Sequence, residues 1–115
     1  MSRATLDQMI EFATTEVASQ DRDKLKSLVR RMAGKWPQEK ALGLAFALTS
    51  AAASFEDNLD DKEKKSTLGQ AYRLAALVAA DVLAIEALGN CPALCLDLLH
   101  YWRRVDPWFL DDRAQ

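Results

Sequence analysis

The stretch that decides the fold is ALGLAFALTSAAASF, residues 41–55, which contains no charged side chain. Alanine and leucine lose little conformational freedom in a helix, so this run predicts a helix that begins at Pro37 and ends at residue 55. This helix carries no charge after Lys40 and so has no strongly polar face to turn to water, and we expect it to be the most buried element. The run is also shorter than the roughly 20 residues needed to cross a bilayer.

The composition extends the helical prediction to the whole chain of 115 residues. Alanine occurs 19 times and leucine 17 times, whereas the strand formers valine and isoleucine occur five times and twice. The three prolines stand where apolar segments of helical periodicity begin, and Gly34 and Gly89 stand where such segments end. We therefore predict an all-α fold, a single-domain bundle of about five helices with a short aromatic tail at 105–115. The predicted helices cover residues 6–18, 22–33, 37–55, 62–88 and 92–104.

The totals and the missing motifs exclude several classes of function. The formal net charge of −2 argues against general binding to nucleic acid or to an anionic membrane. Two cysteines are too few for the disulfide framework of a secreted domain, and the first residues lack a signal pattern, so we expect a cytoplasmic protein without a membrane segment. The sequence lacks a glycine-rich phosphate loop, a nucleophile elbow and an HExxH motif. It therefore predicts no cofactor and no metal site.

Four residues near the C-terminus could carry chemistry: Glu86, Cys91, Cys95 and His100. Cysteines at the start of a helix can have a lowered pKa and react as thiolates. This set resembles the helical alkylhydroperoxidase-like (carboxymuconolactone decarboxylase) proteins, which place two cysteines and a histidine on one helix with a glutamate upstream. The resemblance implies a redox protein in which Cys91 reacts and Cys95 resolves it. The spacings depart from the family pattern, and a helix would turn His100 away from Cys91. We predict no catalytic residues and keep the cysteine-dependent redox protein as an alternative.

Residues 22–35 carry six basic side chains and one acidic one. Such a basic helix on an acidic body could contact phosphates, and its candidate contacts are Lys26, Arg30 and Arg31. The cations flank the apolar stripe of the helix, as they do when lysine and arginine stems cover a core and their charged ends stay in water. Binding of a polyanion or nucleic acid is therefore a second alternative.

Our functional prediction rests on apolar side chains that lie away from the expected core. The fourth predicted helix has a broad core face, yet Leu77, Ala84 and Leu88 lie on its opposite side. Either this helix is central and covered all round within one chain, or its second face meets another chain. Trp108 and Phe109 follow the last helix and either fold back to close the bundle or anchor a partner. We predict a small non-enzymatic helical protein that acts through protein–protein contacts at these residues. Its first partner is a second copy, so we expect a homo-oligomer, with another protein as a further option.

Overall fold

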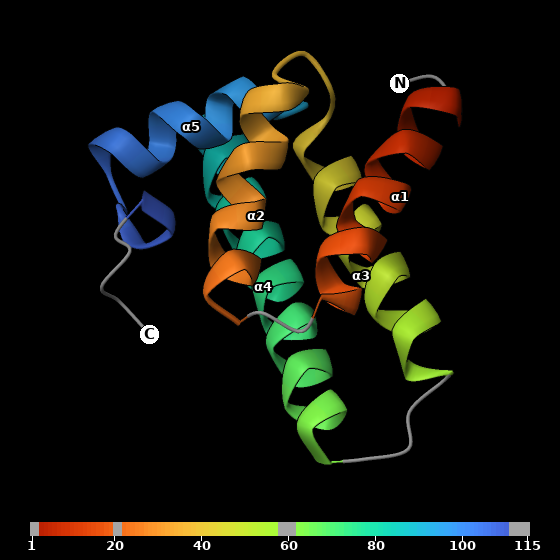
Figure 1. Ribbon diagram of the computed structural model, residues 1–115. Helices are drawn as coiled ribbons and strands as arrows, with labels where there is room; N and C mark the ends of the chain where they lie inside the picture. Colours follow the sequence, from red (N-terminus) through yellow and green to blue (C-terminus); the bar gives the residue numbers. More distant parts are fainter. Residues whose placement is uncertain (1–2, 20–21, 58–61, 111–115) are drawn as a thin grey trace.

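The computed structural model describes residues 3–19, 22–57 and 62–110. Within these ranges the chain forms five α-helices and one short 3-10 helix, which confirms the predicted all-α bundle (Figure 1). Residues 111–115 of the predicted aromatic tail lie outside the described residues. The elements are α1 (Arg3–Ala18), α2 (Arg22–Lys35), α3 (Ala41–Glu56), α4 (Lys62–Ala87), α5 (Cys95–Arg104) and η1 (Trp108–Leu110).

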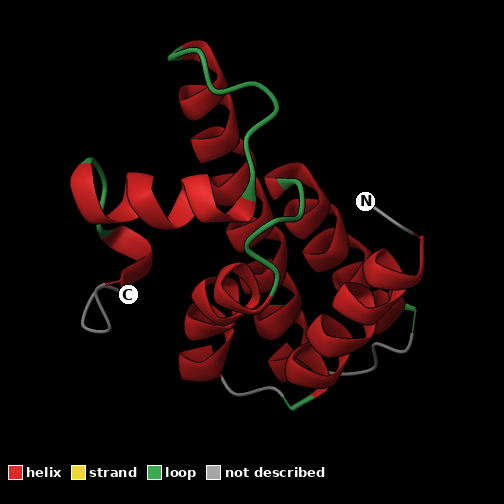
Figure 2. Cartoon of the chain, turned by 90° about the horizontal axis from the view of Figure 1, so that it is seen from above, coloured by secondary structure: helices red, strands yellow, loops and turns green. Residues whose placement is uncertain are grey.

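The long helix α4 contacts every other α-helix of the bundle. Helix α3 packs along α4 and along α1, and these two contacts are the most extensive in the described structure. Helix α5 lies at a steep angle across one end of α2 and α4, and η1 turns back beneath it toward α2 (Figures 1 and 2). The C-terminal elements therefore close one end of the bundle.

The core is rich in alanine and leucine, as the composition predicts. Small side chains at the contact surface let helix axes come close together. On α3 the buried residues are Ala41, Leu44, Ala45, Ala47, Leu48, Ala51 and Ala52. For the core face of α4 the sequence predicts Leu68, Ala71, Ala75, Val78, Ala79, Val82 and Ile85. All of these are buried except Ala79, which is half-buried beside the α3–α4 contact, and Leu74 is buried in addition.

The start of α3 differs from the prediction, because α3 begins at Ala41 and not at Pro37. In a helix that began at Pro37, the N–H of Ala41 would donate to the carbonyl of Pro37. Here the N–H of Ala41 donates to the carbonyl of Ala93 at 2.9 Å, and the carbonyl of Pro37 accepts from Leu96 at 2.9 Å. Both groups are therefore used by a distant segment, and residues 37–40 form a turn.

The start of α5 moves for the same reason, from the predicted Pro92 to Cys95. The N–H of Cys95 donates to the carbonyl of Glu39 at 2.8 Å. The N–H of Leu94 donates to the Asp97 carboxylate at 2.8 Å. These bonds satisfy N–H groups that a helix start leaves without partners. The loop before α3 and the loop before α5 are thus joined by backbone hydrogen bonds. Helix α1 also starts earlier than predicted, at Arg3, because residues 3–5 are compatible with a helix.

Part of α4 could cross a membrane by length and composition alone. The segment Lys65–Ala87 has a mean hydropathy of 1.4 in its most apolar window. The central helix of a soluble bundle passes the same test, and α4 packs against four other helices here. The expectation that the protein has no membrane segment stays a prediction.

The close packing of α3 can be tested with two alanines of that helix. Ala47 is fully buried, whereas Ala53 is exposed. We expect Ala47→Leu to lower the free energy of unfolding by about 1–3 kcal/mol, because a well-packed core has no room for a larger side chain. Ala53→Leu should change it by less than about 0.5 kcal/mol. Urea denaturation followed by circular dichroism measures both values, and equal destabilisation would contradict the close contact.

Candidate functional site

The two cysteines lie in different environments. Cys95 is the first residue of α5 and is buried, with its Sγ 3.9 Å from the carbonyl of Lys40. Burial, together with the negative charge of Glu39, raises the pKa of the Cys95 thiol to about 12. Cys91 is exposed in the loop between α4 and α5. Cys95 is therefore protonated at neutral pH, and only Cys91 is accessible to a reagent.

Glu86 has a structural role in this structure. Its carboxylate accepts a hydrogen bond from the N–H of Ala93 at 3.1 Å, which ties the loop before α5 to the end of α4. His100 is exposed on α5, whereas Cys95 is buried on the same helix, so the imidazole and this thiol do not share a cleft. Among the described residues, no group of three or more His, Cys, Asp or Glu side chains is placed to hold a metal ion.

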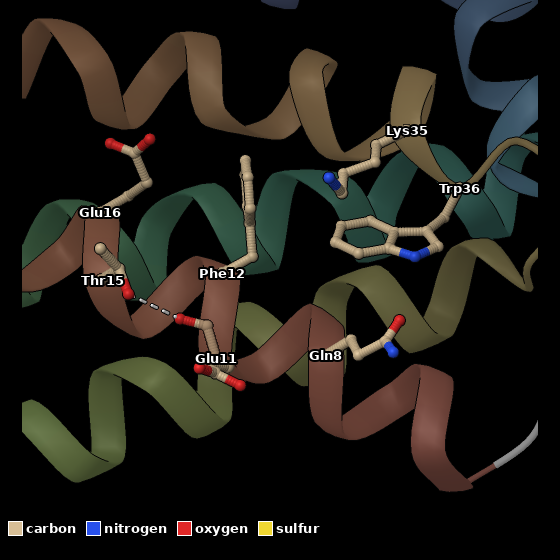
Figure 3. Close-up of a pocket in the computed structure, with 7 residues that line it drawn as sticks. All are labelled: Gln8, Glu11, Phe12, Thr15, Glu16, Lys35 and Trp36. Atoms are coloured by element: carbon tan, nitrogen blue, oxygen red, sulfur yellow. Dashed lines mark hydrogen bonds between the residues drawn. The ribbon is translucent and has the colours of Figure 1, made fainter.

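An open groove of about 400 Å³ lies between α1 and the C-terminal end of α2 (Figure 3). We call it the aromatic groove; its lining residues are Gln8, Glu11, Phe12, Thr15, Glu16, Lys35 and Trp36. The rings of Phe12 and Trp36 meet edge to face, with centroids 5.6 Å apart and an interplanar angle of 86°. The Lys35 ammonium nitrogen is 5.5 Å from each ring centroid.

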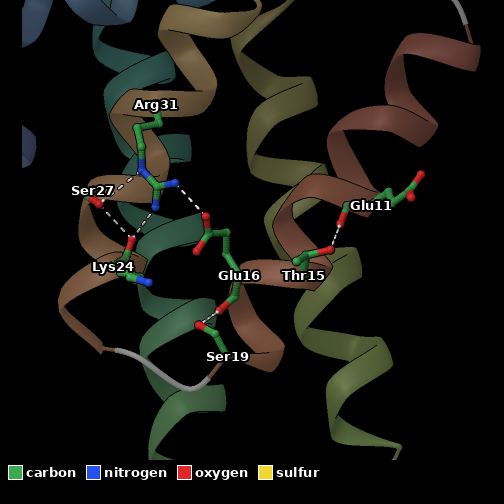
Figure 4. A network of polar contacts seen from close by, with 7 residues as sticks. All are labelled: Glu11, Thr15, Glu16, Ser19, Lys24, Ser27 and Arg31. Carbon is green, nitrogen blue, oxygen red and sulfur yellow. Dashed lines mark hydrogen bonds and ion pairs between the residues drawn. The ribbon is translucent and has the colours of Figure 1, made fainter.

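Arg31, one of the predicted polyanion contacts, joins α2 to α1 (Figure 4). Its Nη1 forms an ion pair with Glu16 at 2.6 Å. The same guanidinium donates to the Ser27 hydroxyl at 3.3 Å and to the carbonyl of Lys24 at 3.1 Å. The side chain is therefore engaged within the protein on several sides.

The other two predicted polyanion contacts hold the C-terminal segment. Lys26 is only 6% exposed, and its Nζ lies 4.3 Å from the centroid of the Trp108 ring. Arg30 donates from Nη1 to the carbonyl of Phe109 at 3.5 Å. Cations above aromatic faces are stabilised by the ring quadrupole. Both side chains thus contribute to the contact between α2 and η1.

The aromatic tail folds back onto the bundle. Phe109 is buried, with its ring centroid 4.8 Å from that of Trp102 and 5.0 Å from that of Trp108. Trp108 and Phe109 also line a small pocket of about 180 Å³ together with Leu77 of α4. The tail therefore stands across this pocket from one side of α4, and Phe109 belongs to the protein's own core.

The residues predicted to contact a partner from α4 are exposed to different degrees. Leu77 and Ala84 are half-buried, whereas Leu88, directly after α4, is 79% exposed. Leu77 packs against the core and lines a small pocket together with Trp108 and Phe109. Of the three, Leu88 is the side chain that the described structure leaves open to solvent.

A second groove, of about 400 Å³, runs between α3 and α4 and was not predicted. We call it the α3–α4 groove; its lining residues are Leu42, Ala45, Phe46, Thr49, Tyr72, Ala75, Ala76 and Ala79. Leu42 is 60% exposed and Phe46, one turn later, is 54% exposed. Leu83, one turn beyond Ala79 on α4, is 71% exposed. None of the lining residues is charged.

Both hydroxyl groups that line this groove are hydrogen-bonded within the protein. The Thr49 hydroxyl donates to the carbonyl of Ala45 at 3.0 Å, so its polar group is used within its own helix. The Tyr72 hydroxyl donates to the Glu56 carboxylate at 2.9 Å and joins α4 to the end of α3. The sequence did not reveal this surface, because α3 is apolar all round and its periodicity does not indicate which side faces water.

Asp81 lies inside the bundle's closed end, half-buried on α4. Its carboxylate accepts a hydrogen bond from the indole N–H of buried Trp102 at 2.9 Å. Burial raises the pKa of Asp81 above its ordinary value, the bond from Trp102 opposes this effect, and the charge of Asp106 adds to it. The carboxylate therefore orients a core tryptophan and is less stable in its charged form than an exposed aspartate.

The contrast between the cysteines predicts their reactivity. At pH 8 a thiol with a pKa of about 12 is ionised in roughly one molecule in ten thousand. We expect Ellman's reagent to modify Cys91 quickly in the folded protein and Cys95 only after denaturation. Cys91→Ser should abolish the fast reaction, and Cys95→Ser should leave it unchanged. A folded-state rate for Cys95 equal to that of Cys91 would contradict its burial.

The raised pKa of Asp81 predicts a pH-dependent stability difference. A carboxyl group of this kind costs stability once the pH rises above its unfolded-state pKa, since the folded protein then resists ionisation. Asp81→Asn keeps an acceptor for the Trp102 N–H and cannot ionise. Its melting temperature should exceed that of the wild type at pH 7, and the gain should shrink toward about pH 3.

Asp81→Leu is the matched variant without an acceptor. It leaves the buried indole N–H of Trp102 without a partner, and we expect a loss of about 1–3 kcal/mol at both pH values. Thermal unfolding of the three proteins measures these differences. A larger gain for Asp81→Asn at low pH than at pH 7 would refute the assigned direction of the pKa.

Comparisons with known proteins give no family to which the chain can be assigned. No protein-family model matches it, and no curated protein or solved structure matches it. The function proposed below therefore rests on the contacts, burial and charges of this chain.

Proposed function

We propose that this protein is a non-enzymatic, cytoplasmic helical protein that acts through protein–protein contacts, first with a second copy of itself. The observation that carries the proposal is the exposure of Leu42 and Phe46 beside the uncharged α3–α4 groove. Large apolar side chains gathered on one surface typically mark a contact site in a soluble protein. Leu83 extends the same surface along α4.

A second copy fits this surface better than a charged partner. The groove offers no charged side chain with which a charged partner could pair, and the hydroxyls of Thr49 and Tyr72 are already bonded to Ala45 and Glu56. Most homo-oligomers use the same patch on both subunits around a two-fold axis. The apolar patch of one copy would place Leu42 and Phe46 against the alanines of α4 in the other. Such a contact removes apolar surface from water on both sides at once.

The two alternatives have less support. A redox role would need a reactive pair of thiols, but Cys95 is buried with a raised pKa. Polyanion binding through α2 would need available cations, but Lys26 is almost fully buried and Arg31 is paired with Glu16. Cys95, Lys26 and Arg31 are thus engaged in packing or ion pairing within the bundle.

The mass of the protein in solution tests the proposal. Size-exclusion chromatography with light scattering, at roughly tens of micromolar, should give twice the chain mass of 12.8 kDa. The double variant Leu42→Glu/Phe46→Glu places charges in the contact and should raise the dissociation constant by roughly thirtyfold or more. Both positions are exposed in the monomer, so the variant should keep its helical circular dichroism.

The control is a double variant of equally exposed apolar side chains elsewhere, Leu88→Glu/Val105→Glu. It should keep the wild-type mass. A strictly monomeric wild-type protein would refute self-association. Dissociation by the control variant, with no effect of the α3 variant, would move the contact to the end of α4.

A further inference from the structure

We propose that the aromatic groove between α1 and α2 is a binding site for a small organic ammonium ion. It shares no lining residue with the α3–α4 groove, so this proposal does not depend on self-association. The site is formed by two aromatic rings at right angles and the C-terminal end of a helix, and the side chains of Glu11 and Glu16 stand at its edges (Figure 3).

The aromatic corner is suited to a positive charge. Phe12 comes from the middle of α1 and Trp36 follows the last residue of α2, and their edge-to-face contact makes two walls of the groove. The face of an aromatic ring attracts a cation placed within about 6 Å of its centroid. The ammonium of Lys35 is at such a distance from both rings at once. The side-chain ammonium of Lys35 thus already lies beside the two rings.

The charges around the Phe12 and Trp36 rings also favour a positively charged ligand. Glu11 and Glu16 contribute carboxylates to the lining, and Glu16 is balanced by its ion pair with Arg31. Glu11 lies at the edge of the groove, with its carboxylate turned away from the two rings (Figure 3), so it contributes negative charge near the site and no direct contact at the corner. The last turn of α2 adds the partial negative charge of a helix C-terminus. Apart from Lys35, no lining residue carries a positive charge that would repel a cation.

Lys35 is the group that a ligand must displace. It is exposed, and its long stem can swing its ammonium into water at little cost. A quaternary ammonium ion is more weakly hydrated than a lysine and gains more from two ring faces, which is why such ions are recognised by aromatic cages. The groove, at about 400 Å³, is open enough to admit a compact ion of this kind.

The experiment uses tetramethylammonium chloride as the probe, with tert-butanol as a neutral molecule of similar shape, at constant ionic strength. The indole N–H signal of Trp36 in a proton–nitrogen NMR spectrum, assigned with Trp36→Phe, reports binding. We expect a saturable shift with tetramethylammonium and a response at least roughly fivefold weaker with tert-butanol. Lys35→Gln should tighten binding several-fold, whereas Lys40→Gln, an exposed lysine outside the groove, should leave it unchanged.

Two further pairs of variants separate the site from a general effect of charge. Phe12→Leu should weaken binding by roughly fivefold, and Phe55→Leu, which removes an aromatic ring elsewhere, should not. Glu11→Gln should weaken binding, whereas Asp7→Asn, one turn earlier on α1, should have no effect. Absence of a saturable shift in both the wild type and Lys35→Gln would overturn the proposal. Equal binding of tert-butanol, or weaker binding by Lys35→Gln, would overturn it as well.

Discussion

The lack of any ionisable side chain between Ala41 and Phe55 is the constraint on which the structure depends. A helix of this composition gains stability only where its surface leaves water. Two helices, α1 and α4, cover most of it, and the alanines at these contacts allow the close approach. One side of α3 is left uncovered, and it carries Leu42 and Phe46. The same property that builds the core thus produces the apolar surface that we propose as the contact.

The helical fold could be predicted from the sequence because its signals are local. Alanine and leucine content, apolar periodicity and the positions of proline and glycine all act within one or two turns of a helix. The starts of α3 and α5 could not be predicted, because the carbonyl of Pro37 and the N–H of Ala41 bond to a segment more than fifty residues away. A proline at a helix start is compatible with either arrangement.

The candidate site was less predictable, because most residues that suggest chemistry are used in packing. Glu86 bonds to the backbone before α5, Lys26 lies over Trp108, and Phe109 fills the core. Their residue types suit catalysis or binding, but their burial and their bonding partners decide their role. Both depend on the tertiary structure and cannot be inferred from the spacing of residues along the chain. The α3–α4 groove shows the opposite case. Leu42 and Phe46 look like core residues in the sequence and differ from their neighbours only in what covers them.

Intermolecular contacts of the Phe46 ring are the most direct test of the proposed surface. Isotope-filtered nuclear Overhauser spectra of a mixture of labelled and unlabelled protein detect only protons that approach each other across two copies. The account predicts cross-peaks between the Phe46 ring and the Ala76 and Leu42 methyl groups of the other copy, since these residues line the same groove. Cross-peaks that involve Leu88 and none that involve Phe46, or no intermolecular cross-peaks at millimolar concentration, would contradict it.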